Sequence, residues 1–110
     1  MPKRKNDIAA INDKFRKDPL PNGKLMLTRG IADKGDDFGR KAIHAVKNFS
    51  DFTKGNDPYS EHGFGAFDLD GERLFWKIDC YDRSLVFGSP DPTDETVTIR
   101  VLTIMLAEEY

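Results

Sequence analysis

The sequence predicts an α+β protein built on a three-stranded antiparallel meander (about residues 63–87), as one domain spanning residues 1–110. Two observations point to this fold class. Apolar and polar residues alternate on both sides of the turn signal Asp70-Gly71, as in a β-hairpin. Other segments place apolar residues at helical spacing. The predicted helices cover about residues 5–16, 37–52 and 94–108.

The N-terminal segment has the pattern of a short amphipathic helix. Ile8, Ile11, Asn12 and Phe15 recur at helical spacing, and the basic residues that follow complement the helix dipole. A short alternating stretch at 24–28 then reads as a strand that can extend the sheet.

The second helix has the clearer apolar stripe. Phe38, Ala42, Val46 and Phe49 follow the spacing of one buried face, which predicts a helix over about 37–52. A Gly- and Pro-containing loop follows it.

The hairpin turn fixes a register for the central strands. It places Leu69 opposite Glu72, Phe67 opposite Leu74 and Gly65 opposite Trp76. The apolar residues Phe67, Leu69, Leu74 and Trp76 then share the core face. A second turn at Asp82-Arg83 leads into the predicted third strand at 84–87.

The C-terminal segment is consistent with either element. Val97, Ile99 and Val101 are β-branched and suit a strand. The spacing of the apolar residues from Val101 to Leu106 suits a helix, and the prediction is a helix over about 94–108.

The same register places His62 opposite Asp79 on the face away from the core, within reach of an imidazole–carboxylate hydrogen bond. Such a pair can serve acid–base chemistry or can be purely structural. The candidate catalytic residues are His62, Asp79, Tyr81 and Glu61. The candidate binding residues are Asn56, Asp57, Tyr59, His62, Lys77 and Tyr81. No strong metal-ligand spacing or cofactor motif is present, so neither a metal nor a cofactor is predicted.

The net charge of −2 hides an asymmetry. Residues 1–50 carry twelve Lys/Arg against six Asp/Glu, a net +6, and residues 51–110 carry five against thirteen, a net −8. Such a molecule can meet partners of opposite sign, or both charge sets can be solvated surface.

The single Cys excludes an intramolecular disulfide, and the longest apolar run is too short to span a membrane. The prediction is a cytoplasmic protein without membrane association.

Several segments together resemble a family of small bacterial proteins, a domain of unknown function common on plasmids and other mobile elements. The segments are NDKFR (12–16), FxxFxxxNDPYxEHxFG (49–65), FWKIDCYD (75–82), GSPDP (88–92) and TIRVLTIMLAEEY (98–110). The resemblance implies a compact one-domain protein in a mobile-element context, but no activity and no catalytic residues. Members often carry Tyr where this chain has Cys80, which argues against a catalytic role for the thiol.

The expected function is a small non-enzymatic protein-binding module that inhibits a host defence system of the CRISPR or restriction type, with a host protein or complex as partner. One alternative is a small hydrolase or nuclease using the His–Asp site. Another is a nucleic-acid-binding accessory that uses the basic N-terminal half, including Lys3-Arg4-Lys5. The sequence does not determine the oligomeric state.

Overall fold

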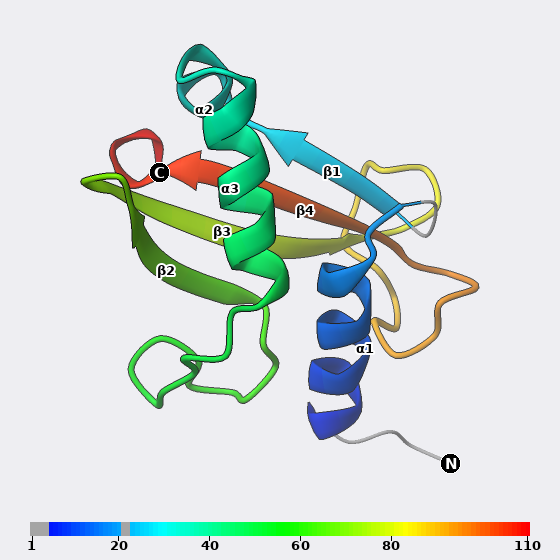
Figure 1. The fold of residues 1–110 in the computed structure, drawn as a ribbon. Helices are drawn as coiled ribbons and strands as arrows, with labels where there is room; N and C mark the ends of the chain where they lie inside the picture. Colours follow the sequence, from blue (N-terminus) through cyan, green and yellow to red (C-terminus); the bar gives the residue numbers. More distant parts are fainter. Residues whose placement is uncertain (1–4, 21–22) are drawn as a thin grey trace.

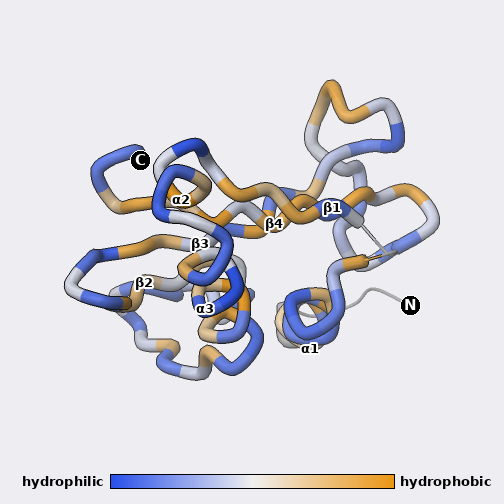
Figure 2. The backbone as a smooth tube through the Cα atoms, turned by 45° about the horizontal axis from the view of Figure 1, so that its top comes forward, coloured by the Kyte–Doolittle hydropathy of each residue, from blue (hydrophilic) through white to orange (hydrophobic). Residues whose placement is uncertain are grey.

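The computed structural model describes residues 5–20 and 23–110, so Lys3 and Arg4 of the basic run lie outside it. A four-stranded mixed sheet in the order β1-β4-β3-β2 carries α1 and α3 on one of its faces (Figures 1 and 2). This confirms a mixed α+β fold. The elements are α1 (Lys5–Lys17), β1 (Gly23–Leu27), α2 (Arg29–Asp33), α3 (Asp36–Lys47), β2 (Phe64–Leu69), β3 (Glu72–Tyr81), β4 (Ile99–Leu106) and the 3₁₀ turn η1 (Ala107–Glu109).

The β2–β3 hairpin has the predicted register. Leu69 pairs with Glu72, and Gly65 pairs with Trp76. Asp70 (φ 50°) and Gly71 (φ 82°) both adopt positive φ, the conformation of the two-residue turn that Asp-Gly favours. The local turn chemistry therefore sets this half of the sheet.

The second neighbour of β3 is β4, not residues 84–87. β4 pairs antiparallel with β3, with Ile104 opposite Trp76. The helix predicted over 94–108 is therefore wrong. Because β4 is a central strand covered partly on both faces, Met105 is buried beside Leu106, and such consecutive apolar residues imitate helical spacing. The predicted third strand is also wrong, since residues 82–88 form a turn closed by a single bridge between Tyr81 and Gly88.

The strand predicted near 24–28 is confirmed as β1, which pairs in parallel with β4. The segment after it contains the short helix α2, whose Ile31 is fully buried. Glu109 fastens the C-terminal turn to the start of α2, because its carboxylate accepts hydrogen bonds from Thr28 Oγ1 (2.6 Å) and the Gly30 amide (2.9 Å). The Leu106 amide donates a third hydrogen bond (2.8 Å).

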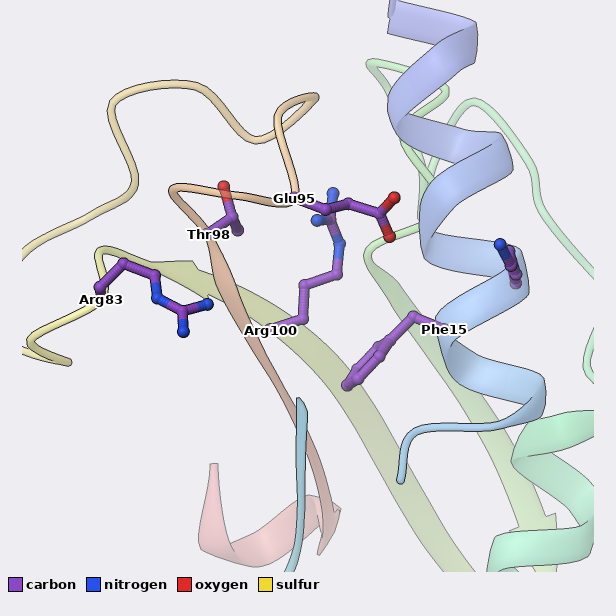
Figure 3. Close-up of a pocket in the computed structure, with 6 residues that line it drawn as sticks. Phe15, Arg83, Glu95, Thr98 and Arg100 are labelled. Atoms are coloured by element: carbon purple, nitrogen blue, oxygen red, sulfur yellow. The ribbon is translucent and has the colours of Figure 1, made fainter. Parts of the chain in front are cut away.

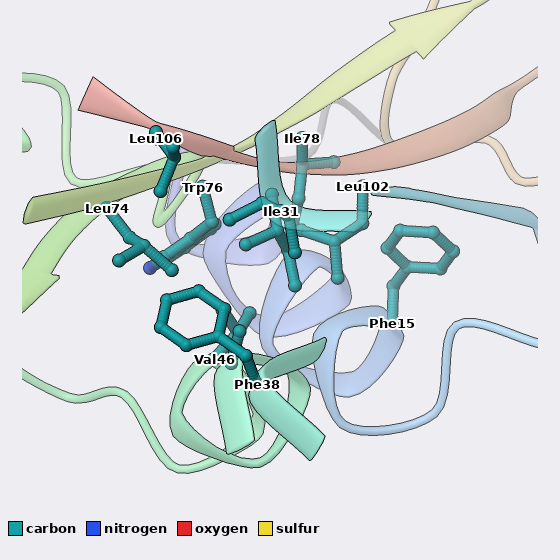
Figure 4. Packing of buried hydrophobic residues seen from close by; sticks show 11 residues of the cluster. Phe15, Ile31, Phe38, Val46, Leu74, Trp76, Ile78, Leu102 and Leu106 are labelled. Carbon is teal, nitrogen blue, oxygen red and sulfur yellow. The ribbon is translucent and has the colours of Figure 1, made fainter. Parts of the chain in front are cut away.

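The core lies between the sheet and the helices. Figure 4 shows Phe38 and Val46 of α3 directed toward the sheet residues, with Phe15 of α1 at one side of the cluster. α3 ends at Lys47, earlier than the predicted residue 52. The chain after it is irregular, yet Phe49 and Phe52 still pack on the core through edge contacts with Trp76. The fully buried apolar side chains are Ile31, Ala42, Val46, Leu74, Trp76 and Ile104.

The opposite face of the sheet, which α1 and α3 do not cover, is called here the open face and includes Phe64, Phe75, Lys77, Asp79 and Tyr81. Phe64 and Phe75 pack 5.2 Å apart between ring centroids, and the exposed ring of the C-terminal Tyr110 contacts both. Within the described residues, no helix has both the length and the apolar character needed to cross a membrane.

The first prediction concerns the close approach of Gly65 to Trp76. A Cβ at Gly65 would collide with Trp76 Nε1 and would lie 2.8 Å from Phe49 Cε1, whereas a Cβ at Gly88 meets open space. Gly65→Ala is therefore expected to lower the free energy of unfolding by about 3 kcal/mol, the upper range for overpacking. Gly88→Ala is expected to change it by less than about 0.5 kcal/mol. Urea unfolding measures both, and equal effects would contradict the packing of Trp76 described here.

The second prediction is a pH dependence carried by Glu109. The hydrogen bond from Thr28 and those from two backbone amides lower the pKa of Glu109 below its ordinary value of 4.5. A lowered folded-state pKa adds stability above the unfolded-state pKa, and this stability is lost as the pH falls through the folded-state value.

Glu109→Gln is therefore expected to be less stable than wild type at neutral pH, and the difference is expected to shrink as the pH falls below about 4.5. Unfolding curves from pH 7 to pH 3 measure it. The control is Glu108→Gln, because no described residue donates a hydrogen bond to the exposed Glu108 carboxylate. A difference that is independent of pH would contradict the role of the Glu109 carboxylate.

Candidate functional site

The predicted site residues divide between the two faces of the sheet. Asp79 lies on the open face, where its carboxylate accepts a hydrogen bond from Lys77 Nζ (3.0 Å) and thereby raises the pKa of the lysine above its ordinary value. Tyr81 lies on the same face by its place in β3.

His62 lies away from these residues, and its predicted pairing with Asp79 is wrong. The regular pairing of β2 begins at Phe64, and one further backbone hydrogen bond joins the Ile78 amide to the Gly63 carbonyl. His62 itself has a φ of 54°. This positive φ interrupts the alternation on which the prediction depended, and the ring turns toward α1 instead.

The His62 ring is held on three sides. Its Nδ1 lies 2.9 Å from Asp13 Oδ1 of α1, and its Nε2 lies 3.7 Å from Asp57 Oδ2. The ring stacks in parallel on Phe52, with 3.8 Å between centroids. With a carboxylate beside each nitrogen, the ring connects α1 to the loop over residues 48–63.

The other predicted loop residues maintain the shape of that loop. Asp57 accepts hydrogen bonds from the backbone amides of Glu61 (3.0 Å) and His62 (3.2 Å). Asn56 accepts one from the Thr53 amide (2.8 Å). Tyr59, in contrast, is 63% exposed.

Arg16 is the residue that the sequence interpretation missed at this site. Its Nη1 donates to the carbonyls of Val46 (2.6 Å) and Phe49 (2.8 Å), and its Nη2 donates to Asp13 (2.8 Å). The guanidinium also lies 4.9 Å from the centroid of the Trp76 ring. Only 2% of Arg16 is exposed.

A signal for Arg16 was present in the sequence. It follows Asn12 by four residues and Ile8 by eight, so it lies on the helix face that the apolar pattern marks as buried. Arg16, Asp13, Phe52, Asp57 and His62 are called here the Arg16 cluster.

Asn12 connects α1 to both the loop and the sheet. Its Nδ2 donates to the Glu61 carbonyl (2.8 Å), and its Oδ1 accepts a hydrogen bond from Arg100 Nε of β4 (2.7 Å). The backbone of Glu61 is thus part of this network. Asn12 and Arg100 are both buried.

The chemistry available to the Arg16 cluster is limited. A His held by a carboxylate through Nδ1 can act as a base when a hydroxyl or thiol lies at Nε2. In the described part of the chain no hydroxyl or thiol hydrogen-bonds to Nε2 of His62, and Asp57 occupies that side. Two shallow cavities of about 330 and 200 Å³ include His62 in their walls.

Cys80 is not an activated nucleophile. Burial raises the pKa of its thiol, although the nearby positive charge of Arg100 opposes the shift. Among the described residues, no group of three or more His, Cys, Asp and Glu side chains is arranged to hold a metal ion.

One family model matches the chain, over residues 27–109, and its description is "Protein of unknown function (DUF3768)". The match covers β2, β3, β4 and the two helices after β1, and it leaves α1 and all of β1 except Leu27 outside. No match was found among curated proteins or among solved structures.

The third prediction tests Arg16. Arg16→Lys keeps the charge, but an ammonium cannot serve two carbonyls and a carboxylate while lying flat beside Trp76. We expect a loss of roughly 3 kcal/mol in the free energy of unfolding, because the carbonyls of Val46 and Phe49 and the carboxylate of Asp13 each lose a hydrogen bond from the guanidinium. Chemical denaturation measures it. The control is Arg29→Lys at a site that is 93% exposed, and a loss at Arg16 no larger than at Arg29 would contradict the central role of the guanidinium.

Proposed function

The chain belongs to the DUF3768 family of proteins of unknown function, and from its own geometry we propose that it is a non-enzymatic protein-binding module. The proposed contact is the turn over residues 82–88, which follows β3 and is drawn in yellow beside β1 in Figure 1. This turn includes residues that the sequence analysis assigned to a strand.

The observation that carries the proposal is a run of three apolar side chains exposed to solvent. Leu85 is 40% exposed, Val86 65% and Phe87 70%. Single exposed apolar residues are common on protein surfaces, but consecutive large ones on one turn are typical of an interaction site. The aromatic residue of this run, Phe87, is the kind of side chain that dominates binding energy at protein interfaces.

The turn is also ordered in advance of any contact. The Asp82 carboxylate accepts hydrogen bonds from the Ser84 hydroxyl (2.7 Å) and from the amides of Ser84 (3.1 Å) and Val86 (3.2 Å). These hydrogen bonds lower the pKa of Asp82 below its ordinary value, and the one from the Ser84 hydroxyl has the largest effect. Because the turn is fixed on folding, binding through it requires little further ordering.

The backbone of Leu85 supports the same interpretation. Its φ of 62° is unfavourable for a leucine, and the hydrogen bonds to Asp82 hold the chain in this conformation. Residues held in such conformations concentrate at sites of function. Here the conformation presents apolar side chains to solvent, which has no benefit for the stability of the isolated chain.

The non-enzymatic part of the proposal is supported by the dispersal of the candidate catalytic residues. His62 and the backbone of Glu61 belong to the loop that packs on α1, whereas Asp79 and Tyr81 lie on the open face. His62 stacks on Phe52 and contacts two carboxylates, as a structural residue would.

We extend the proposal to the class of partner. A host protein or complex of a bacterial defence system, of the CRISPR or restriction type, is the proposed target, and inhibition is the proposed effect. The support is the resemblance of the sequence to small proteins of plasmids and other mobile elements, together with its small size and the opposite charges of its two halves.

The fourth prediction tests the turn as the contact. In affinity capture from a bacterial host lysate, the wild-type protein is expected to retain a stoichiometric protein partner. Phe87→Ser is expected to weaken that complex about 30-fold or more, because loss of a central aromatic contact typically costs about 2 kcal/mol. Binding of the purified partner, measured by calorimetry, gives the ratio.

The matched control is Tyr59→Ser, an aromatic residue of similar exposure on the other loop. It is expected to bind as wild type does. Asp82→Asn keeps every apolar side chain but loosens the turn, and it is expected to give an intermediate affinity. Retention of the partner by Phe87→Ser together with its loss in Tyr59→Ser would assign the contact to the 48–63 loop and overturn the proposal.

A further inference from the structure

A cavity of about 310 Å³ lies where α1, the 82–88 turn and the start of β4 meet (Figure 3). It is separate from the Arg16 cluster, and no candidate residue from the sequence analysis lines it. Its walls hold three cationic side chains and one carboxylate. The lining residues are Lys14, Phe15, Arg83, Glu95, Thr98 and Arg100.

Arg100 forms the base of this cavity and is only 4% exposed. Its Nε donates to Asn12 Oδ1 (2.7 Å) and its Nη2 to the Pro92 carbonyl (2.6 Å), and both acceptors are neutral. Within the described residues nothing accepts a hydrogen bond from Nη1. These two bonds fix the plane of the guanidinium and leave one nitrogen available to a ligand.

The positive charge of this guanidinium is not balanced by an ion pair within the described residues. No carboxylate of the described residues forms an ion pair with Arg100, Arg83 or Lys14. A buried charge normally lies beside an opposite charge, because an unpaired one costs several kcal/mol of desolvation free energy, of which neutral oxygens recover only a part. The three cationic side chains of this cavity are therefore not neutralised by ion pairs within the described part of the chain.

We propose that this cavity binds a phosphoryl group. Arg100 donates from the base, and Arg83 and Lys14 approach from the turn and from α1. Planar guanidinium groups match the oxygens of a phosphate, and a lysine adds a compact charge. With Glu95 included, the lining carries a net charge of two positive units, which balances a phosphate dianion better than a single carboxylate.

Glu95 adjusts the strength of this site. Its carboxylate lines the cavity without a cationic partner among the described residues and so opposes the entry of an anion. A site with both a strong donor at its base and a repelling group beside it binds reversibly, and removal of the repulsion strengthens binding.

The test is calorimetric titration of the purified protein with inorganic phosphate at low and constant ionic strength, with acetate as the matched monoanion. Saturable binding of phosphate that is tighter than that of acetate is expected. Arg83→Gln and Lys14→Gln each remove one exposed cation and are expected to weaken phosphate binding about tenfold, as for the loss of one charged hydrogen bond. Glu95→Gln is expected to tighten it.

Arg73→Gln, at an exposed position outside this lining, is the control and is expected to bind phosphate as wild type does. Arg100→Lys is the direct test of the base of the cavity, with its fold checked by circular dichroism. Absence of saturable phosphate binding, equal binding of acetate, or equal affinity in Arg83→Gln and Arg73→Gln would overturn the proposal. Because these substitutions leave Val86 and Phe87 intact, failure here is distinguishable from failure of the protein-binding proposal.

Titration with a phosphoserine peptide, compared with inorganic phosphate, identifies the source of the phosphoryl group. Tighter binding of this peptide than of inorganic phosphate assigns the group to a modified protein side chain. Equal or weaker binding assigns it to a free phosphate compound.

Discussion

The guanidinium of Arg16 is the interaction on which the rest of the structure depends. The carbonyls at the end of α3 have no helical partner, and the chain after it has no regular structure up to Phe64. Loops of this length are uncommon inside compact proteins. Arg16 donates to the carbonyl of Val46 in α3 and to that of Phe49 just after it, pairs with Asp13 and lies beside the Trp76 ring. One side chain of α1 thus joins the other helix, the loop and the sheet. His62, which belongs to the loop, also contacts Asp13, and this contact further attaches the loop to α1.

The parts of the fold that could be predicted from the sequence are those that local chemistry determines. Asp70-Gly71 determines its own turn, and the turn then sets the register of β2 and β3. β4 could not be identified in this way, because a central strand lacks the simple alternation of a strand with one face in water. Its parallel partner β1 lies at the other end of the chain. The resulting errors were linked, since the hairpin strand β3 needed a second neighbour and residues 84–87 were the nearest in sequence.

The candidate site was predictable in composition but not in geometry. His62 was identified, yet its partner is Asp13, 49 residues earlier, and no local pattern brings the two together. The segment NDKFR was recognised as a characteristic motif, and the structure gives its members a physical role. Asn12 and Asp13 bind the loop, Phe15 enters the core, and Arg16 closes the end of α3. Helical spacing placed Asn12 and Arg16 on the buried face, but a charged residue at a helix end is far more often solvated.

Two arginines of this protein, Arg16 and Arg100, are buried although charged residues normally lie at the surface, and their surroundings differ. Arg16 is buried, and Asp13 balances its charge while two carbonyls accept hydrogen bonds from its Nη1; its Nε has no hydrogen-bond partner among the described residues. Arg100 is buried to nearly the same degree, but both of its hydrogen-bond acceptors among the described residues are neutral oxygens. The chain also exposes Phe87 while it buries these two charges. Departures from the usual burial rules concentrate at functional sites. Arg16, whose charge Asp13 balances, serves the fold, whereas Arg100 and the 82–88 turn are the positions at which we propose that this protein meets other molecules.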